Sequence, residues 1–349
     1  MSQLPPLTAI RPGPRAQGGG SAPLLCHLDG GPIDVSVCVV NWNCREVLRA
    51  CLASLLRQPQ GVRLEVIVVD NASSDGAADL VEREFPDALL VRNRANHGFA
   101  RANNQAARLA RGRYLFFLNN DTRVPPLALR RLVDFADAHP EAGLIGPRLR
   151  NGAGKLQFSY RRRPTVATLL HRTTLLRWTG LFRRAYRRSR RQDAKRNDPR
   201  PVEVLMGAAL LLRREAFAQC GPWDEGYTFG GEDMELCLRV GRRYAVVYLP
   251  AVEVTHYGRM STRQHLRYTA THIPAGFVRF LRQSGAAPSA LLLYKLVISL
   301  DAPLQWLVKA VQYLWRRAWG RRDKAEKTRL AMRGAACFLR EGLLPFWKA

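Results

Sequence analysis

The sequence lacks the patterns that mark several common classes of protein. Its seven cysteines form no Cys-x-x-Cys pair and are odd in number, so no zinc cluster is indicated. Neither a GxGxxG after the first strand pattern nor a GxxxxGK(S/T) occurs, which removes the main support for dinucleotide-dependent oxidoreduction and P-loop hydrolysis. Several cysteines lie within apolar strand or helix patterns, and we interpret them as reduced core residues of a protein that faces the cytosol.

Acidic residues are also scarce. The 349 residues include 28 Asp and Glu against 55 Lys and Arg, a formal net charge of +27. The excess is local, because residues 161–200 hold 14 Lys and Arg against two acids, and residues 279–349 hold 14 against four. We therefore expect two basic regions that meet anionic surfaces, rather than a uniformly basic protein.

The first 32 residues have no hydrophobic periodicity. They are rich in Pro and Gly, which predicts a disordered leader over residues 1–32. A charged start followed by an apolar run, the mark of a secretion signal, is missing, so export is not expected.

From residue 35 onward, strand and helix patterns alternate. Apolar runs of strand length are followed by amphipathic stretches such as Arg45–Leu56, and this alternation predicts βαβ units with a mostly parallel central sheet. The four predicted strands are Val35–Val40, Leu64–Val69, Ala88–Val91 and Tyr114–Leu118.

Polar side chains follow each of these strands. Because the carboxyl ends of parallel strands meet at one edge, where ligands bind in open α/β sheets, four polar strand ends outline a site. A carboxylate at that edge suits a divalent cation that carries phosphate oxygens. The alternative for the last group is that it caps the helix that Pro125 and Pro126 open. The residues concerned are Asn41, Asn43, Asp70, Asp75, Asn96, Asn119, Asn120 and Asp121.

Four motifs in this order closely resemble the inverting glycosyltransferases of family 2, which have the GT-A fold. They are Val-Ser-Val-Cys-Val-Val-Asn-Trp-Asn-Cys, Val-Ile-Val-Val-Asp-Asn-Ala-Ser-Ser-Asp-Gly, Asn-His-Gly-Phe-Ala-Arg-Ala-Asn-Asn and Phe-Leu-Asn-Asn-Asp-Thr. The resemblance covers about residues 35–260 and is greatest to the rhamnosyltransferase-type branch, which builds bacterial cell-surface polysaccharides. It implies a GT-A domain over residues 33–278, with residues 161–200 as a basic insertion.

The resemblance also implies roles on the donor side. Asp70 would hydrogen-bond the nucleobase, with the backbone around Asn41 on the other side of that pocket. Asp121 matches the last acid of the DxD motif and would bind Mg²⁺ or Mn²⁺ on the donor diphosphate. Asn119 stands where many members have the first Asp. Residues Asn43, Asp75, Asn96, Gly98 and Asn120 complete the expected nucleotide-sugar site.

On the acceptor side, Glu232-Asp233 matches the family's ED motif. Inversion needs a general base that takes the acceptor hydroxyl proton while the oxygen attacks the anomeric carbon. Asp233 would be that base, and Glu232 would help to bind sugar hydroxyls. Simple capping of a helix N-terminus is the alternative for both. His256 would join Asp121 on the cation, whereas a lone histidine out of context is usually structural.

The basic segment and the C-terminal tail favour an anionic membrane surface. In residues 291–317 polar residues recur every three or four positions, which predicts an interfacial amphipathic helix; packing onto the catalytic domain is the alternative. Charged residues at 295, 301 and 309 interrupt the apolar run, so a spanning helix is not expected. Residues 279–349 thus form a predicted membrane-associating tail, and the QxxRW motif of processive synthases is absent.

The sequence predicts transfer of one sugar from a nucleotide-diphosphate donor, with dTDP-rhamnose as a candidate, to a lipid-linked or polysaccharide acceptor. Its place would be the inner face of the cytoplasmic membrane. A non-enzymatic basic protein that binds nucleic acid or anionic lipid is the alternative, but acids at strand ends would repel phosphates. No nucleic-acid partner is therefore expected. A glycosyltransferase-like protein without activity is a third hypothesis, supported only by Asn119.

Overall fold

The computed structural model describes residues 9–10, 31–190, 197–258 and 266–349, with side chains from residue 31 onward. Nearly all of the expected leader, residues 1–32, and residues 191–196 of the basic segment lie outside these ranges. The chain divides into two compact units. The sheet unit comprises Met1–Tyr160, Gln192–Glu225 and Leu236–Ser261, and the helical unit comprises Arg161–Arg191, Gly226–Glu235 and Thr262–Ala349.

This division differs from the expected boundaries in three respects. Residues 161–191 of the basic segment group with the C-terminal tail, whereas residues 192–200 stay with the sheet unit. Residues 226–235, which include Glu232 and Asp233, and residues 262–278 also group with the tail instead of the catalytic domain. The physical reason is packing, since the segment folds into short helices that contact the tail. Each unit is described separately below.

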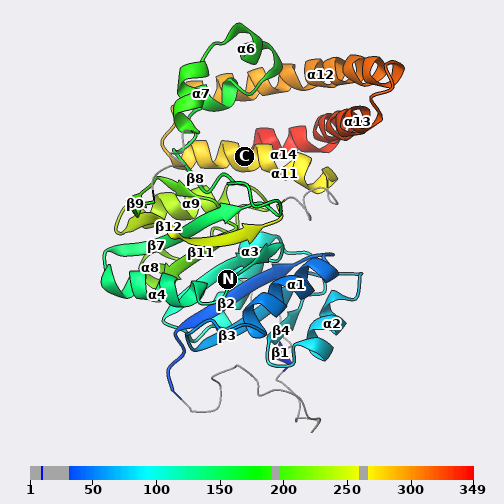
Figure 1. Ribbon diagram of the computed structural model, residues 1–349. Helices are drawn as coiled ribbons and strands as arrows, with labels where there is room; N and C mark the ends of the chain where they lie inside the picture. Colours follow the sequence, from blue (N-terminus) through cyan, green and yellow to red (C-terminus); the bar gives the residue numbers. More distant parts are fainter. Residues whose placement is uncertain (1–8, 11–30, 191–196, 259–265) are drawn as a thin grey trace. The chain divides into compact units, whose positions relative to one another are not determined.

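The sheet unit is built on one large mixed sheet (Figure 1). The strand order is β1-β4-β3-β2-β5-β11-β7-β12-β6, with β9 paired to β12. The strands are β1 (Ala9–Ile10), β2 (Val35–Asn41), β3 (Leu64–Asp70), β4 (Leu89–Arg92), β5 (Tyr114–Asn119), β6 (Thr122–Arg123), β7 (Ala142–Arg150), β9 (Arg200–Pro201), β11 (Ala209–Arg213) and β12 (Ala245–His256). Two short strands, β8 (Tyr160–Arg161) and β10 (Val204–Leu205), lie outside this sheet.

The strands β2 to β5 form a parallel part of the sheet, as the alternating patterns predicted, and β1 is added antiparallel to β4. β2 lies between β3 and β5, and β3 also pairs with β4, all in parallel. Beyond β5 the sheet becomes mixed, because β11 runs antiparallel to both β5 and β7. The carboxyl ends of β2, β3, β4 and β5 therefore meet at one edge, which is the edge that carries the polar strand ends.

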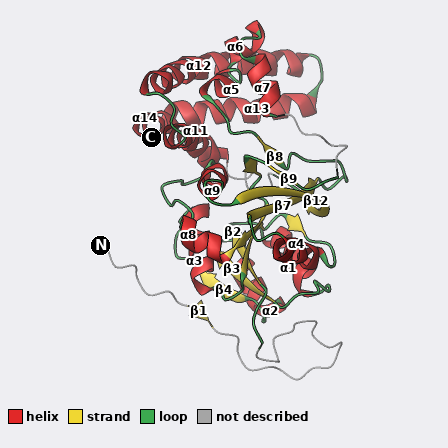
Figure 2. Ribbon diagram, turned by 90° about the vertical axis from the view of Figure 1, so that its left-hand side faces the viewer, coloured by secondary structure: helices red, strands yellow, loops and turns green. Residues whose placement is uncertain are grey.

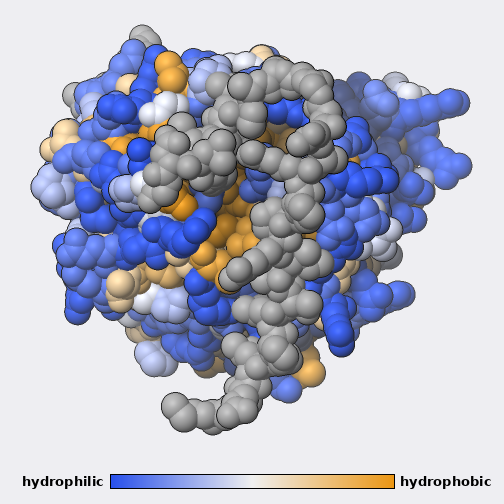
Figure 3. Space-filling model, turned by 90° about the horizontal axis from the view of Figure 1, so that it is seen from below, coloured by the Kyte–Doolittle hydropathy of each residue, from blue (hydrophilic) through white to orange (hydrophobic). Residues whose placement is uncertain are grey.

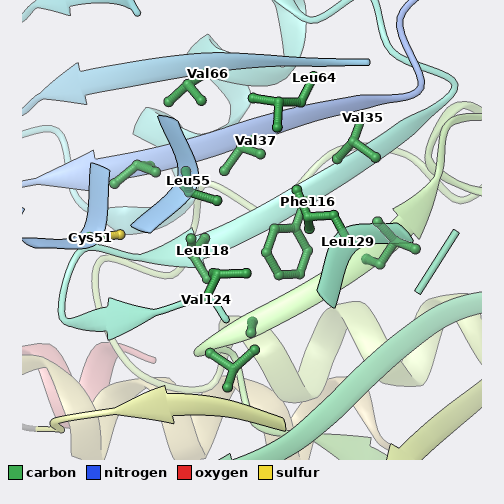
Figure 4. Close-up of a cluster of buried hydrophobic side chains, with 14 of the residues drawn as sticks. Val35, Val37, Cys51, Leu55, Leu64, Val66, Phe116, Leu118, Val124 and Leu129 are labelled. Atoms are coloured by element: carbon green, nitrogen blue, oxygen red, sulfur yellow. The ribbon is translucent and has the colours of Figure 1, made fainter. Parts of the chain in front are cut away.

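Helices cover both faces of this sheet (Figure 2). On one face α1 (Arg45–Leu56), α2 (Ala77–Glu84) and α4 (Ala128–Ala138) pack against residues such as Val37, Val66 and Phe116, several of which Figure 4 shows as one cluster. On the other face, α3 (Phe99–Leu109), α8 (Arg214–Cys220) and the later half of α9 (Glu232–Val240) pack against Ile67 and Phe117. Alternate residues of a strand point to opposite faces, so two separate cores form.

Figure 3 shows the molecule from below. The surface in this view is mainly hydrophilic, with hydrophobic residues gathered near the middle of the view.

The helical unit has its own apolar core. Its elements are α5 (Val166–Leu170), α6 (Thr174–Thr179), α7 (Arg183–Ser189), α11 (Leu266–Gln283), α12 (Pro288–Ala318), α13 (Arg322–Cys337), η1 (Phe338–Gly342) and α14 (Leu343–Lys348). Leu169 and Leu170 of α5 join Val278, Tyr294 and Phe346 in this core. The basic segment thus contributes to a folded structure, and its Thr174 N–H donates to Asp301 Oδ1 of α12 at 2.7 Å.

Helix α12 is long and mostly exposed. It has 31 residues, and an 18-residue window within it reaches a mean hydropathy of 1.4 while only 11% of that window is buried. By length and composition alone, α12 could cross a membrane. The charged residues at 295, 301 and 309 therefore leave the helix apolar enough to do so. The core helix of a soluble protein meets the same criteria but is mostly buried, unlike α12.

Candidate functional site

Three buried polar side chains meet where β2, β3 and β5 end. Asn41 Nδ2 donates to Asp70 Oδ1 at 3.2 Å, and Asn120 Nδ2 donates to Asn41 Oδ1 at 2.7 Å. All three residues are at most 6% exposed. Asp70 Oδ2 also accepts from the Ser73 N–H at 2.9 Å, which leaves each carboxylate oxygen a second acceptor site.

The loop after β3 is tied to the loop after β2. Ser73 Oγ accepts from the Asn43 N–H at 2.9 Å, and Asn43 Oδ1 accepts from the Ser74 N–H at 2.7 Å. Asn43 has φ 51°, a left-handed conformation that asparagine tolerates better than most residues. The two Asp75 oxygens accept from the N–H groups of Arg45 and Ala77, so Asp75 holds the starts of α1 and α2 together.

Asn71 links this group to the loop after β4. Its Nδ2 donates to Asn96 Oδ1 at 2.7 Å, and its Oδ1 accepts from the His97 N–H at 3.1 Å. Asn96 Oδ1 also accepts from the Gly98 N–H, and Gly98 has φ 81°, which glycine adopts without strain. Six of the eight predicted nucleotide-sugar residues are therefore joined in one network, the exceptions being Asp75 and Asn119.

Asn119-Asn120-Asp121 does not cap the helix that follows. α4 begins at Ala128, and the residue that precedes it is Leu127 with φ 60°. The turn instead connects β5 to β6, where the Asn119 carbonyl oxygen accepts from Thr122 Oγ1 at 2.7 Å. Asp121 is 4% exposed and Asn119 is half-buried. The capping alternative is thereby excluded, and the Asp121 carboxylate needs another explanation.

His256 supplies the partner of Asp121. β12 pairs with β6 so that His256 lies opposite Thr122, and this register brings His256 Nε2 to 3.2 Å from Asp121 Oδ1. On the other side of the ring, Nδ1 lies 2.9 Å from Gln157 Oε1, while Gln157 Nε2 donates to the His256 carbonyl oxygen at 2.6 Å. The histidine ring is thus held from both sides.

These contacts fit a divalent cation. Since Gln157 Oε1 can only accept, Nδ1 carries the proton, and a neutral ring then turns its Nε2 lone pair towards the Asp121 oxygen. Two acceptors at that distance are favourable only with a proton or a cation between them. The described residues contain no group of three or more His, Cys, Asp or Glu side chains that could hold a metal ion, so the remaining ligands would be waters or substrate oxygens, as Mg²⁺ and Mn²⁺ accept.

The Glu232-Asp233 pair begins α9 and belongs to the helical unit. Glu232 is 8% exposed, and its Oε2 has no hydrogen-bond partner among the residues that the structure describes. Burial and, second, repulsion by Asp233 raise the pKa of Glu232 to about 8. Asp233 is half-buried, and its Oδ1 accepts from the Met234 N–H at 2.8 Å. The first turn of a helix favours acidic residues, but capping does not explain why Glu232 Oε2 is buried without a hydrogen-bond partner among the described residues.

Sequence reasoning missed three residues of the site. Asn71 and Ser73 lie within the same recognised motif as Asp70, so the motif could have indicated that they belong to the site. Gln157 follows β7 in a stretch without hydrophobic periodicity, and nothing in its surroundings indicates a contact with His256.

Comparison with known proteins gives a consistent result. The model of the family described as glycosyl transferase family 2 matches residues 36–221. An N-acetylglucosaminyl-diphospho-decaprenol L-rhamnosyltransferase of Mycobacterium tuberculosis is 31% identical over 226 residues, which cover 61% of the chain and 71% of that protein. The O-antigen biosynthesis protein RfbC of Myxococcus xanthus is 29% identical over 244 residues, which cover 67% of the chain but 18% of RfbC.

Among solved structures, the chain is similar to GalNAc-T7, crystallised with UDP, GalNAc and Mn²⁺. The TM-score is 0.51 at 17% sequence identity, over 74% of the chain and 52% of GalNAc-T7. At this identity the similarity concerns the fold, and it confirms the expected GT-A architecture.

Proposed function

The chain belongs to glycosyl transferase family 2, and we propose that it transfers one sugar from a nucleotide-diphosphate donor to a lipid-linked saccharide, with inversion at the anomeric carbon. The observation that carries this proposal is the pairing of the buried Asp121 with the half-buried His256 beside the polar network at the carboxyl edge of the sheet. The family assignment replaces the alternative of a non-enzymatic basic binding protein.

The donor would bind along this edge. The network around Asn41 and Asp70 offers amide and carboxylate groups for the nucleobase and ribose. Asp121 Oδ1 and His256 Nε2 would hold Mg²⁺ or Mn²⁺, which when bound neutralises the charge that develops on the leaving diphosphate. Gln157 keeps the histidine ring in the orientation and tautomer that such ligation needs.

On the acceptor side, Asp233 would take the proton of the attacking hydroxyl. The base must be ionised at neutral pH. Glu232, whose pKa is raised to about 8, is therefore the less suitable of the two carboxyl groups for this role. Because burial and the neighbouring Asp233 raise the pKa of Glu232 to about 8, the Glu232 O–H can donate to a sugar oxygen at neutral pH.

The relatives narrow the substrate classes. The mycobacterial relative is named for L-rhamnose transfer to N-acetylglucosaminyl-diphospho-decaprenol, and it is matched over 71% of its length. We extend both classes to this chain: a nucleoside-diphosphate rhamnose as donor, and a polyprenyl-diphospho sugar as acceptor. Cell-envelope polysaccharide synthesis follows as the process served.

The test is a transfer assay with the purified full chain. Nucleotide sugars, including dTDP-rhamnose, are offered with a polyprenyl-diphospho-N-acetylglucosamine acceptor, in Mn²⁺, Mg²⁺ or chelator. We expect one donor to give a product with inverted anomeric configuration by NMR, only with metal. Asp121→Ala should abolish turnover, whereas Asp134→Ala, an exposed aspartate of α4 that pairs with Arg130, should not. Absence of product from every donor, with folded protein and bound nucleotide, would reject the proposed chemistry.

The acceptor class points to a membrane, and α12 carries a surface that suits one. Seven aliphatic residues recur at intervals of three or four along it, and all are exposed, from 38% at Leu304 to 74% at Leu300. They are Leu293, Leu296, Leu300, Leu304, Leu307, Val311 and Leu314. We call this set the α12 stripe.

We propose an anionic bilayer as the occupant of the α12 stripe, and the charges next to it support this choice. Arg316 and Arg317 end the helix, Arg321 and Arg322 follow it, and Trp315 and Trp319 are 49% and 69% exposed beside them. Tryptophan and arginine at the end of an apolar stripe are typical of helices that lie in the lipid headgroup region. The one acid of α12, Asp301, is turned to Thr174.

Vesicle flotation tests this part of the proposal. We expect binding to vesicles that contain anionic lipid, release by alkaline carbonate, and loss of binding in Leu300→Glu. Leu344→Glu, which alters an exposed leucine of α14 outside the stripe, should bind as the wild type does. Resistance to carbonate would indicate a helix that crosses the bilayer. Self-association that Leu300→Glu abolishes, without any vesicle binding, would assign the stripe to a second copy of the chain.

A further inference from the structure

The turn that leads into Glu232 and Asp233 is fixed by a helix far along the chain. Residues 226–235 group with the helical unit, although sheet-unit residues precede and follow them. Their principal partner there is α11, Leu266–Gln283. Whatever fixes the position of this turn also fixes the carboxylates two and three residues after Gly230.

A buried tyrosine anchors the beginning of the turn. Tyr227 is 2% exposed, and its hydroxyl donates to Gln283 Oε1 in the last turn of α11 at 2.6 Å. The Arg279 guanidinium carbon lies 5.3 Å from the centre of the same ring. One aromatic ring thus receives both a hydrogen bond and a cation–π contact from α11.

Closer to the acids, the two backbones touch. A Cβ placed on Gly276 of α11 would lie 1.8 Å from the Gly230 carbonyl oxygen, so only glycine permits this approach. Gly230 and Gly231 have φ 86° and 105°, conformations that other residues adopt only with strain. A Cβ on Gly231 would in turn lie 3.2 Å from the Gly276 carbonyl oxygen. Three glycines therefore set the distance between α11 and the start of α9.

The middle of the turn is held by a third contact. The Tyr268 hydroxyl donates to the Thr228 carbonyl oxygen at 3.3 Å, and the rings of Phe229 and Tyr268 meet at 63° with centres 5.9 Å apart. Contacts from the first turn, the middle and the end of α11 thus fix successive residues of one short turn. Backbone held at that many points has little freedom to shift.

We propose that α11 is the positioning element for the catalytic base, with Gly276 and the Tyr227–Gln283 hydrogen bond as the residues through which it acts. This inference rests on the proposed role of Asp233. A base works only within hydrogen-bond reach of the acceptor hydroxyl, and a displacement of about 1 Å can reduce the rate by about 100-fold. The donor ligands lie in the sheet unit, so α11 governs the rate of transfer and not donor affinity.

The decisive variant is Gly276→Ala, compared with Gly334→Ala. The first adds a methyl group against backbone, whereas a Cβ on Gly334 of α13 would meet only Leu266 Cδ1 at 3.5 Å, an ordinary contact. We expect Gly276→Ala to lower kcat by about 100-fold with the dissociation constant of the nucleoside diphosphate unchanged. Gly334→Ala should match the wild type in both. A milder variant, Tyr227→Phe, should lower kcat by about tenfold while donor KM is kept.

A second readout does not depend on activity. Amide hydrogen exchange of peptides from residues 226–235 should be at least about tenfold faster in Gly276→Ala than in Gly334→Ala, while peptides of β2 and β3 exchange equally. If the wild type is active and Gly276→Ala exchanges faster without a fall in kcat, the positioning role is overturned. Unchanged exchange and kcat in both Gly276→Ala and Tyr227→Phe would overturn the whole inference. If exchange is faster in Gly276→Ala but the wild type has no transferase activity, the role assigned to Asp233 is wrong, while the contact between α11 and the turn is supported.

Discussion

The two units hold their acidic residues in opposite ways. In the sheet unit, Asp70 is surrounded by donors, with an amide on one oxygen and a backbone N–H on the other. In the helical unit, the Glu232 Oε2 has no hydrogen-bond partner among the described residues, and the turn before it is held by glycine contacts and aromatic rings. The comparison teaches that side-chain hydrogen bonds fix the proposed donor residues, whereas close packing against α11, together with the Tyr227–Gln283 hydrogen bond, fixes the turn before the proposed base.

This difference has an energetic meaning. A buried carboxylate with two donors is satisfied before any ligand arrives, so the donor edge is prepared in advance. A buried carboxyl oxygen without a partner among the described residues, such as Glu232 Oε2, carries an unmet desolvation cost, which the hydroxyl groups of the proposed acceptor can relieve. Removing single groups from each unit therefore tests whether the contrast is real, and the expected effects differ in kind.

The largest effect is expected from Asp233→Asn. Loss of a general base typically costs a factor of 10² to 10⁴, and we expect kcat to fall about 1000-fold, or about 4 kcal/mol. The nucleoside diphosphate should bind as before, because its ligands lie in the sheet unit. Single-turnover kinetics and calorimetry measure the two quantities. An equal loss of donor affinity would erase the distinction between the units.

The second effect is a pH dependence of stability due to Glu232. Its pKa is about 8 when folded, against 4.5 as the ordinary value. Between these values Glu232 binds more protons in the folded state than in the unfolded state, so its contribution to the free energy of unfolding falls as pH rises from 4.5 to 8 and is constant outside that window. We expect Glu232→Gln to remove about 3 kcal/mol of this fall. Urea unfolding at pH 5 and pH 8 measures it, with the surface variant Glu326→Gln as control.

The third prediction concerns Gln157, which forms hydrogen bonds with His256. Residues that orient a metal-bound histidine typically contribute a factor of 10 to 100 in metal affinity. Gln157→Ala should weaken Mn²⁺ binding about tenfold, as measured by calorimetry in the presence of nucleoside diphosphate. Gln219→Ala, a surface glutamine that bonds Glu215, should leave the affinity unchanged. Equal affinities in both variants would indicate that the His256 ring is fixed by β12 alone.

The smallest effect is expected at the helical surface. Arg322, at the start of α13, is exposed, and a basic residue near anionic lipid contributes about 1 kcal/mol. Arg322→Ala should therefore weaken binding to anionic vesicles about fivefold, and the difference should vanish at high salt. A salt-independent loss would indicate that Arg322 acts on the fold of the helical unit.

Much of the donor edge could be predicted from the sequence, because its signals are local. Helix α1 was predicted at Arg45–Leu56, where it is found, and strands β2 and β3 each extend one residue beyond the prediction. An apolar run that stops at a polar residue needs no distant partner to be recognised. Asp121 was identified in this way, and the capping alternative could be excluded only once the start of α4 was known.

Features that depend on distant contacts could not be predicted. Strand β7 contains Pro147, which argues against a central strand, yet Pro147 lies beyond the two residues that pair with β11. The apolar run over residues 204–212 does not form one strand but divides into β10 and β11, because residues 206–208 belong to neither strand. Likewise, a glycine in α11 carries no sign that it faces Gly230, since that contact appears only when the chain folds back.

The contact between Gly276 and Gly230 also orders events during synthesis. Gly276 leaves the ribosome after the whole sheet unit has been made, on the order of seconds after Gly231 at about 5–20 residues per second. Until then the turn before Glu232 has no partner to fix it. The nascent chain can therefore complete the proposed nucleotide-binding edge first and position the proposed base last. A chain interrupted between these two points would be able to hold a donor but not to use it.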